Sequence, residues 1–110
     1  MTYSLVISAD AERDLEVLSE YLMDKFGQQI CIHVLEDLFD KMRNLQSFPE
    51  AGIKMDTQVM GMWVGGFYWL KTSKNTILYD FEQHRNEICI LRIVDNRRNV
   101  IRELESYLGN

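Results

Sequence analysis

The sequence predicts a small α+β protein, in which an N-terminal strand and a helical hairpin pack on a small antiparallel β-sheet and a short C-terminal helix follows. Two consecutive amphipathic helix patterns are separated by a single glycine. Alternating strand patterns then occupy most of the second half of the chain. With 110 residues, of which 46% are hydrophobic, the chain can bury one core, so we expect a single domain over residues 1–110.

The first two elements are a strand over residues 3–8 and a helix that follows it directly. Ser8 is a favourable N-cap, and Asp10 and Glu12 would face the positive end of the helix dipole. Gly27 predicts the end of the helix, because glycine adopts the left-handed conformation without a Cβ clash. One apolar stripe at spacings of three and four supports the helix: Ala11, Leu15, Leu18, Leu22 and Phe26.

A second amphipathic helix is predicted over residues 28–45. Pro49 prevents its continuation. Each of the two helices must bury its stripe, and a sheet is the expected partner. The stripe of the second helix consists of Cys31, Leu35, Leu38, Met42 and Leu45.

The remaining residues predict three strands and a last helix. Residues 60–70 are strand-like, although Gly65 and Gly66 interrupt the pattern, and residues 77–82 and 88–95 form a hairpin around a polar turn at 84–86. A final helix over residues 97–107 would place Val100, Ile101 and Leu104 inward. The predicted order is therefore strand, helix, helix, three strands and helix, with the later strands antiparallel.

Charge is distributed unevenly along the chain. The net charge is −5, but residues 71–102 hold seven Lys/Arg against four Asp/Glu. An acidic total argues against general nucleic-acid binding and leaves room for a local basic site. The two cysteines and two histidines do not have metal-ligand spacing, so we expect no metal and no cofactor. The chain shows no signal-peptide pattern and no apolar run near the length of a membrane span, which predicts a cytoplasmic protein without a membrane partner.

Three segments in the predicted order resemble the RelE/ParE toxin superfamily. Residues 8–15 are similar to the start of its first helix, with an Ala-Glu-x-Asp-Leu run. Residues 45–52 are similar to its Leu-x-x-x-Pro-x-x-Gly stop after the helical hairpin, and residues 77–79 with 88–99 resemble its terminal hairpin and arginine signature. The resemblance implies the toxin half of a type II toxin–antitoxin pair, neutralised by a cognate antitoxin protein. It leaves a homo-oligomer and a toxin–antitoxin hetero-oligomer open.

The resemblance implies two branches of activity. ParE-like members arrest growth by binding DNA gyrase as protein ligands, whereas RelE-like members enter the ribosome and cut messenger RNA. RNA cleavage needs a base, an acid and cations for the phosphorane charge, and binding to the ribosome depends on neutralising phosphates. The sparse basic residues therefore favour the ParE-like branch. A non-toxic interaction module that keeps the fold is a third alternative, so whether the chain is an enzyme stays open.

Arg92, Arg97 and Arg98 are the candidates for contacting a target protein or RNA phosphates. Arginine pairs well with carboxylates and phosphates through parallel N–H donors. Arg92 lies within an apolar strand, so its guanidinium must emerge at an edge or meet a carboxylate. For Arg97 and Arg98 the alternative is a solvated pair at a helix start, with Glu103 or antitoxin acids as partners. No catalytic group is assigned, since His84 falls in the predicted turn, away from the arginines.

The apolar run over residues 60–70 contains the candidates for antitoxin binding or self-association, Trp63 and Trp69. Aromatic side chains and methionine are enriched in protein interfaces. The alternative is a central strand that is buried on both faces.

Overall fold

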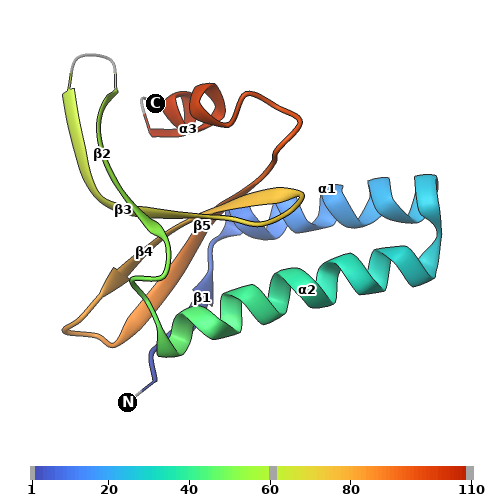
Figure 1. Ribbon diagram of the computed structural model, residues 1–110, viewed down its shortest axis with the longest axis horizontal. Coiled ribbons are helices and arrows are strands. Elements are labelled where there is room, and N and C mark those ends of the chain that lie inside the picture. The colour runs from blue at the N-terminus through green and yellow to red at the C-terminus, as the bar shows by residue number, and fades with distance from the viewer. Residues whose placement is uncertain (1, 60–61, 109–110) are drawn as a thin grey trace.

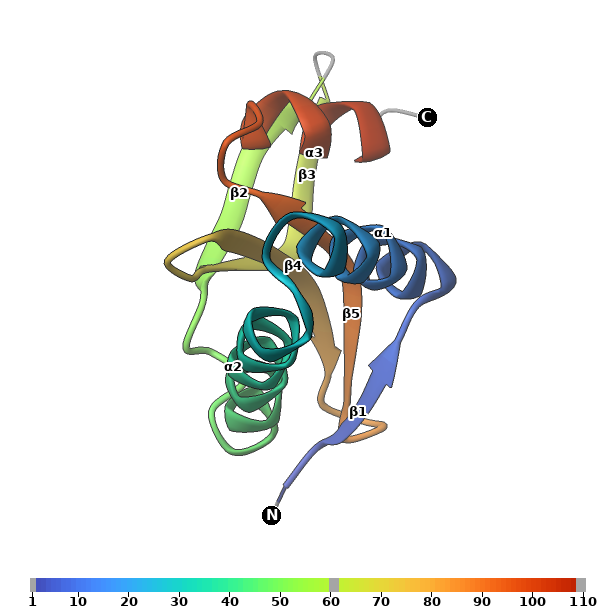
Figure 2. The same cartoon turned by 90° about the vertical axis from the view of Figure 1, so that its right-hand side faces the viewer.

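The computed structural model describes residues 2–59 and 62–108 and contains a five-stranded sheet with two long helices on one face (Figures 1 and 2). The strands lie in the order β1-β5-β4-β3-β2. β1 runs parallel to β5, and the other neighbours are antiparallel. The elements are β1 (Ser4–Ile7), α1 (Ala9–Phe26), α2 (Gln28–Ser47), β2 (Ile53–Val59), β3 (Met62–Lys71), β4 (Asn75–Glu82), β5 (Glu87–Asp95) and α3 (Val100–Leu108).

The helical hairpin forms as the sequence predicts. The Ser8 hydroxyl accepts a hydrogen bond from the Ala11 amide at 3.1 Å, which caps α1. Gly27 has a φ of 89°, a conformation that favours glycine, and lets the chain turn back into α2. The tip of the hairpin extends beyond the sheet in Figure 1, and Phe26 there is 56% exposed rather than buried. The helices bury a core against the sheet that includes Ala11, Leu38, Met42, Leu45, Ile77, Tyr79, Ile88 and Ile90.

The sheet has two features that the prediction did not include. β2 is an additional strand that was not predicted, although its apolar residues and Thr57 alternate with Lys54, Asp56 and Gln58. It lies at the edge of the sheet, where polar residues are common. β1 adds a parallel edge to the antiparallel later strands, a pairing that the prediction left open. The helical hairpin between β1 and the later strands provides the long crossover that a parallel pairing needs.

A β-bulge in β5 changes which side chains face the helices. Tyr79 is paired with Ile90 and Leu78 with Arg92, so Leu91 is an extra residue in β5. Strict alternation predicts that Ile90 and Val94 share a face. Instead, Ile90 packs with the helical core, whereas Val94 packs on the opposite face of the sheet.

The opposite face of the sheet carries α3. Val100 and Tyr107 of α3 pack against a small cluster built on Leu78 and Val94. The helix begins at Val100 rather than at residue 97, because Arg98 donates its backbone N–H to the Asp95 carbonyl in a turn. Ile101, predicted to point inward, is 48% exposed. None of the helices within the described residues is long and apolar enough to cross a membrane.

The corner between α2 and β2 is fastened by Tyr79. The Tyr79 hydroxyl donates to the Pro49 carbonyl at 2.7 Å and accepts from the Gly52 amide at 2.9 Å. A Cβ at position 52 would lie 2.6 Å from that hydroxyl and 2.8 Å from the Trp69 carbonyl oxygen. The Pro-x-x-Gly spacing is thus explained by the close approach of a buried tyrosine.

Candidate functional site: an arginine-lined pocket

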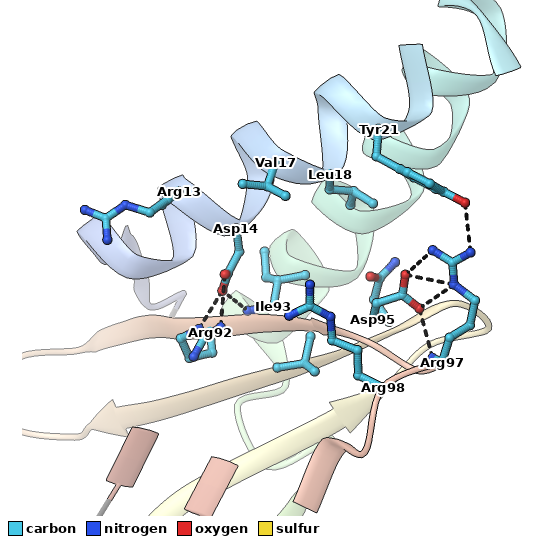
Figure 3. Close-up of a pocket in the computed structure, with 12 residues that line it drawn as sticks. Arg13, Asp14, Val17, Leu18, Tyr21, Arg92, Ile93, Asp95, Arg97 and Arg98 are labelled. Carbon is cyan, nitrogen blue, oxygen red and sulfur yellow. Dashed lines mark hydrogen bonds and ion pairs between the residues drawn. The ribbon is translucent and has the colours of Figure 1, made fainter. Parts of the chain in front are cut away.

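A pocket of about 630 Å³ lies between α1 and the C-terminal part of β5 (Figure 3). Val17 and Leu18 of α1 supply apolar lining. The charged lining consists of Arg13, Asp14, Arg92, Asp95, Arg97 and Arg98. Four arginines and two aspartates therefore line the pocket, which is locally cationic in a chain of net charge −5.

Arg92 is held inside the fold by Asp14. Its Nε donates to one carboxylate oxygen at 2.7 Å, and its Nη2 donates to the other at 3.1 Å. The two side chains are only 19% and 18% exposed. The hydrogen bonds to Asp14 raise the pKa of the Arg92 guanidinium above its ordinary value, against the opposing effect of burial. The guanidinium also lies 5.5 Å from the ring centroid of Tyr107 on α3.

Asp14 also completes the edge of the sheet. β1 is paired with β5 only as far as Ile90, so the following part of β5 has no neighbouring strand on this side. The Asp14 carboxylate accepts from the Ile93 amide at 2.9 Å, and the Ser8 hydroxyl donates to the Leu91 carbonyl at 3.0 Å. Side chains of the α1 region thus satisfy backbone groups that a strand would otherwise pair.

Arg97 forms a second and more open ion pair, with Asp95. Its Nη2 lies 2.6 Å from an Asp95 carboxylate oxygen, and its Nη1 donates to the Tyr21 hydroxyl at 2.8 Å. Its guanidinium carbon lies 4.9 Å from the Tyr21 ring centroid. The Arg97 side chain is 68% exposed and that of Asp95 is 27% exposed. We call this three-residue contact between β5 and α1 the Arg97 bridge.

Arg98 and Arg13 have the weakest internal contacts among the four arginines of the pocket. Arg98 lies 3.6 Å from a Glu103 carboxylate oxygen, an exposed pair at a long distance. Arg13 has no hydrogen-bond or ion-pair partner among the described residues, and in Figure 3 it lies at the opposite end of α1 from Tyr21. These two guanidiniums are the ones that can bind an incoming anion without giving up a short internal contact.

Asn96 ties the end of β5 to the turn before β4. Its side-chain oxygen accepts from the Thr76 hydroxyl at 2.6 Å, and its side-chain nitrogen donates to the Thr72 carbonyl at 3.0 Å. Thr76 is buried. This network fixes the backbone immediately before Arg97 and Arg98, so the direction in which they leave the sheet is set by buried polar contacts.

The structure places Arg92, Arg97 and Arg98, the three candidates from the sequence, in the lining of one pocket. His84 is exposed in the turn at the other end of β5 and does not line the pocket. Sequence reasoning missed four residues that shape the pocket. They are Arg13, Asp14, Tyr21 and Asp95. Arg13 and Asp14 lie within the Ala-Glu-x-Asp-Leu run of the family resemblance, which could have indicated them, whereas nothing in the sequence linked Tyr21 to Asp95.

The two tryptophan candidates lie away from this pocket, on β3. Trp69 is partly buried and packs against the Leu78 and Val94 cluster, on the face of the sheet that carries α3. The backbone of Trp63 is paired with Gln58, but its side chain lies outside the described part of the structure.

The charged groups of the pocket are better suited to binding than to proton transfer. The hydrogen bond from Arg97 holds the pKa of the Asp95 carboxyl below its usual range. A carboxylate with a lowered pKa is a weak general base near neutral pH. Guanidinium groups, by contrast, bind carboxylates and phosphates through paired N–H donors.

The fold of this chain is similar to those of several solved structures. The structure of the chromosomal ParDE TA system from P. aeruginosa has a similar fold, with a TM-score of 0.68 at 20% identity over 86% of this chain and 96% of that one. The RelBE2 toxin–antitoxin complex from Mycobacterium tuberculosis has a TM-score of 0.59 at 19% identity over 87% and 100% of the two chains. The isolated RelE toxin of E. coli has a TM-score of 0.56 at 19% identity over 96% and 98%. The chain therefore shares the fold of these three structures.

The family follows from the sequence match. Residues 5–100 match the family model described as the ParE toxin of the type II toxin-antitoxin system, parDE. No curated protein matches the chain. Because the matched segment covers most of the sequence, the chain belongs to the ParE toxin family of type II toxin–antitoxin systems.

Proposed function

We propose that this chain is a cytoplasmic toxin that arrests bacterial growth by binding DNA gyrase and is neutralised by a cognate antitoxin. The observation that carries the proposal is the family match over residues 5–100, together with a pocket suited to binding. A protein ligand of gyrase needs a complementary surface and no proton-transfer machinery, and the pocket offers guanidiniums beside apolar side chains.

The geometry gives less support to RNA cleavage. A reaction driven by the RNA's own 2′-hydroxyl requires an acid and a base close to the phosphate-binding cations. Within the part of the chain that the structure describes, both carboxylates of the pocket are committed to arginines, and neither histidine lines it. The gyrase proposal therefore stands ahead of the RelE-like alternative.

Pulse-labelling tests the proposed target. The chain is induced alone in a bacterial cell, and incorporation of thymidine and of an amino acid is followed over the first minutes. We expect DNA synthesis to fall first while protein synthesis persists. Early loss of protein synthesis would identify a ribosome-directed toxin and overturn the gyrase proposal. Continued growth with soluble protein verified would make the chain a non-toxic interaction module.

Purified components sharpen the result. In a gyrase supercoiling assay, the wild-type chain should inhibit at a concentration at which the Arg97→Ala variant does not. Arg85→Ala is the matched control, because Arg85 is an exposed arginine in the turn at the other end of β5. Addition of the antitoxin should restore supercoiling.

A further inference from the structure

The two edges of the sheet are protected to different degrees. β2, at one edge, contains the charged residues Lys54 and Asp56, and its pairing with β3 shifts register around Asp56. β1, at the other edge, lies in a stretch, residues 2–9, that has no charged residue, proline or glycine. Charges and irregularities are features by which edge strands avoid pairing with other chains. The β1 edge lacks both.

The backbone of β1 has hydrogen-bonding groups that point away from the sheet. Figure 2 shows β1 as the outermost strand, beside β5. The amides of Ser4 and Ser8 donate to carbonyls in and beside β5 at 2.7 and 2.9 Å, so alternate residues bond inward. Leu5 and Ile7 therefore direct their N–H and C=O groups outward, where the described part of the sheet has no further strand.

The side chains of β1 hold the strand in place and leave one apolar group open. Leu5 and Ile7 pack against the core beneath the helices. Val6 alternates with them, so it points to the opposite face, and it is 40% exposed. Two hydrogen bonds at 2.9 Å between Tyr3 and Gln46 fix the start of the strand to α2. A strand that is already fixed loses little further freedom when another strand pairs with it.

We propose that the β1 edge is a self-association site, at which β1 of a second copy pairs antiparallel with β1 across a two-fold axis. In this register the two Val6 side chains meet at the axis. Leu5 of each copy lies opposite Ile7 of the other, so each of these pairs exchanges its outward N–H and C=O groups in hydrogen bonds. The two sheets join into one continuous sheet, and the two-fold contact closes at a dimer.

Charge complementarity supports a second copy in this orientation. The bond from the Ser4 amide to the Asn86 carbonyl places the turn between β4 and β5, with the exposed Arg85, beside the start of β1. The end of β1 leads into α1, whose first turn contains the exposed Asp10 and Glu12. An antiparallel pair brings each turn toward the start of α1 in the other copy. None of these three charged residues has an ion-pair partner in the part of the chain that the structure describes.

The other charges near this edge are compatible with the pairing. Glu87 is the neighbour of Ser4 on β5, but it alternates with the core residue Ile88 and so points to the face away from the helices. Each copy has a net charge of −5, yet the residues that meet at the axis are uncharged. A parallel pair would instead bring Asp10 toward Asp10 and Arg85 toward Arg85, and like charges disfavour such a contact.

A charge placed at the edge tests the site. Analytical ultracentrifugation of the purified chain without antitoxin, over a wide range of concentrations, should show a reversible monomer–dimer equilibrium. Val6→Lys puts like charges opposite each other at the axis and should raise the dissociation constant of the dimer by roughly tenfold or more. Ile53→Lys is the matched control, because Ile53 is 65% exposed on β2 at the other edge, and it should dimerise as wild type. Thermal unfolding verifies that each variant is folded.

Disulfide formation tests the register. The background is Cys89→Ala, because Cys89 is the neighbour of Val6 on β5 and would compete for a new thiol. With oxidised glutathione as the oxidant, Val6→Cys should give a covalent dimer, since the two Cα atoms would lie about 4.5 Å apart, within disulfide range. Ser4→Cys is the control on the same face of the strand. Its two copies would lie about 13 Å apart along the antiparallel pair and should give little covalent dimer.

The outcomes separate this inference from the proposed function. A chain that stays monomeric at every concentration, or a Val6→Lys variant that dimerises like wild type, would overturn the β1 edge as the site. Equal cross-linking at positions 4 and 6, or none at position 6, would overturn the antiparallel register. No residue of β1 lines the arginine-lined pocket, and each measurement uses the chain alone. The proposed binding of gyrase therefore stands or falls independently.

Discussion

The pocket contains two arginine–aspartate pairs that resemble each other in geometry and differ in burial. Arg92 and Asp14 are 19% and 18% exposed, whereas Arg97 and Asp95 are 68% and 27% exposed. The first pair joins residues 78 positions apart in sequence, and the second joins residues two apart. The same two residue types therefore connect distant elements in one case and shape a local turn in the other.

The difference separates a structural role from a binding role. Breaking the buried pair would leave a guanidinium and the Ile93 amide without their acceptor, which is costly away from water. Breaking the exposed pair would leave groups that water solvates, so it costs little. Arg92 is thus a poor choice for a residue that exchanges partners, whereas Arg97 can release Asp95 for another carboxylate.

Asp14→Ala should have the largest effect on stability. We expect a loss of about 2–4 kcal/mol in the free energy of unfolding, somewhat below that for a fully buried pair, because the side chains retain some solvent contact. Chemical denaturation at neutral pH measures it. An Asp14→Ala/Arg92→Ala double-mutant cycle should show strong coupling between the two residues. A loss no greater than that of Asp95→Ala would remove the distinction between the two pairs.

Asp14→Asn should have an intermediate effect, since the amide oxygen still accepts from the Ile93 amide while the negative charge is lost. We expect a loss of about 1–2 kcal/mol, because the hydrogen bond to the backbone is retained and the charge-assisted bond to Arg92 is not. Hydrogen exchange at the Ile93 amide provides the measurement. Protection there should persist in the Asp14→Asn variant and be lost in the Asp14→Ala variant. Loss of protection in both variants would contradict this division of roles.

Much of the fold could be predicted from the sequence, because helix periodicity, the cap at Ser8 and the stop at Gly27 are local signals. The contact between Asp14 and Arg92 could not be predicted. The position of Arg92 in an apolar strand indicates only that it needs a carboxylate partner, and eleven Asp/Glu residues precede residue 71. The family resemblance did contain Asp14 and Gly52 in its motifs. The structure supplies their physical reasons: one completes the edge of β5 and the other makes room for Tyr79.

Other features escape sequence reasoning for geometric reasons. The bulge at Leu91 leaves no mark in a run of apolar residues, yet it decides that Val94 lies opposite the helices. The Arg97 bridge depends on Tyr21, which lies 76 residues away and looks like any other helical aromatic. Candidate residues at strand ends can therefore be located from sequence, but the cavity between them depends on tertiary contacts.

Tyr21→Phe should affect binding more than stability. The substitution removes the hydroxyl that accepts from Arg97 at 2.8 Å and keeps the ring beneath the guanidinium. We expect the unfolding midpoint to stay within experimental error, because the lost hydrogen bond is exposed to water. Antitoxin affinity should change by a few-fold at most, as Arg97 becomes less rigid. A large drop in the unfolding midpoint would mean that the bridge holds the fold together, as the Asp14 pair does.

The pH dependence of stability should show the smallest effect, arising from Asp95. Arg97 lowers the pKa of this carboxyl in the folded state, so the ionised form stabilises the fold above the ordinary Asp pKa of about 4. That contribution is lost as the pH falls through the lower, folded-state pKa. Denaturation between about pH 5 and about pH 2 should therefore show a shallower loss of stability in Arg97→Gln than in the wild type. Identical slopes for the two proteins would mean that Arg97 does not stabilise the Asp95 carboxylate in solution. The exposed Arg97–Asp95 contact would then not count as a stabilising ion pair.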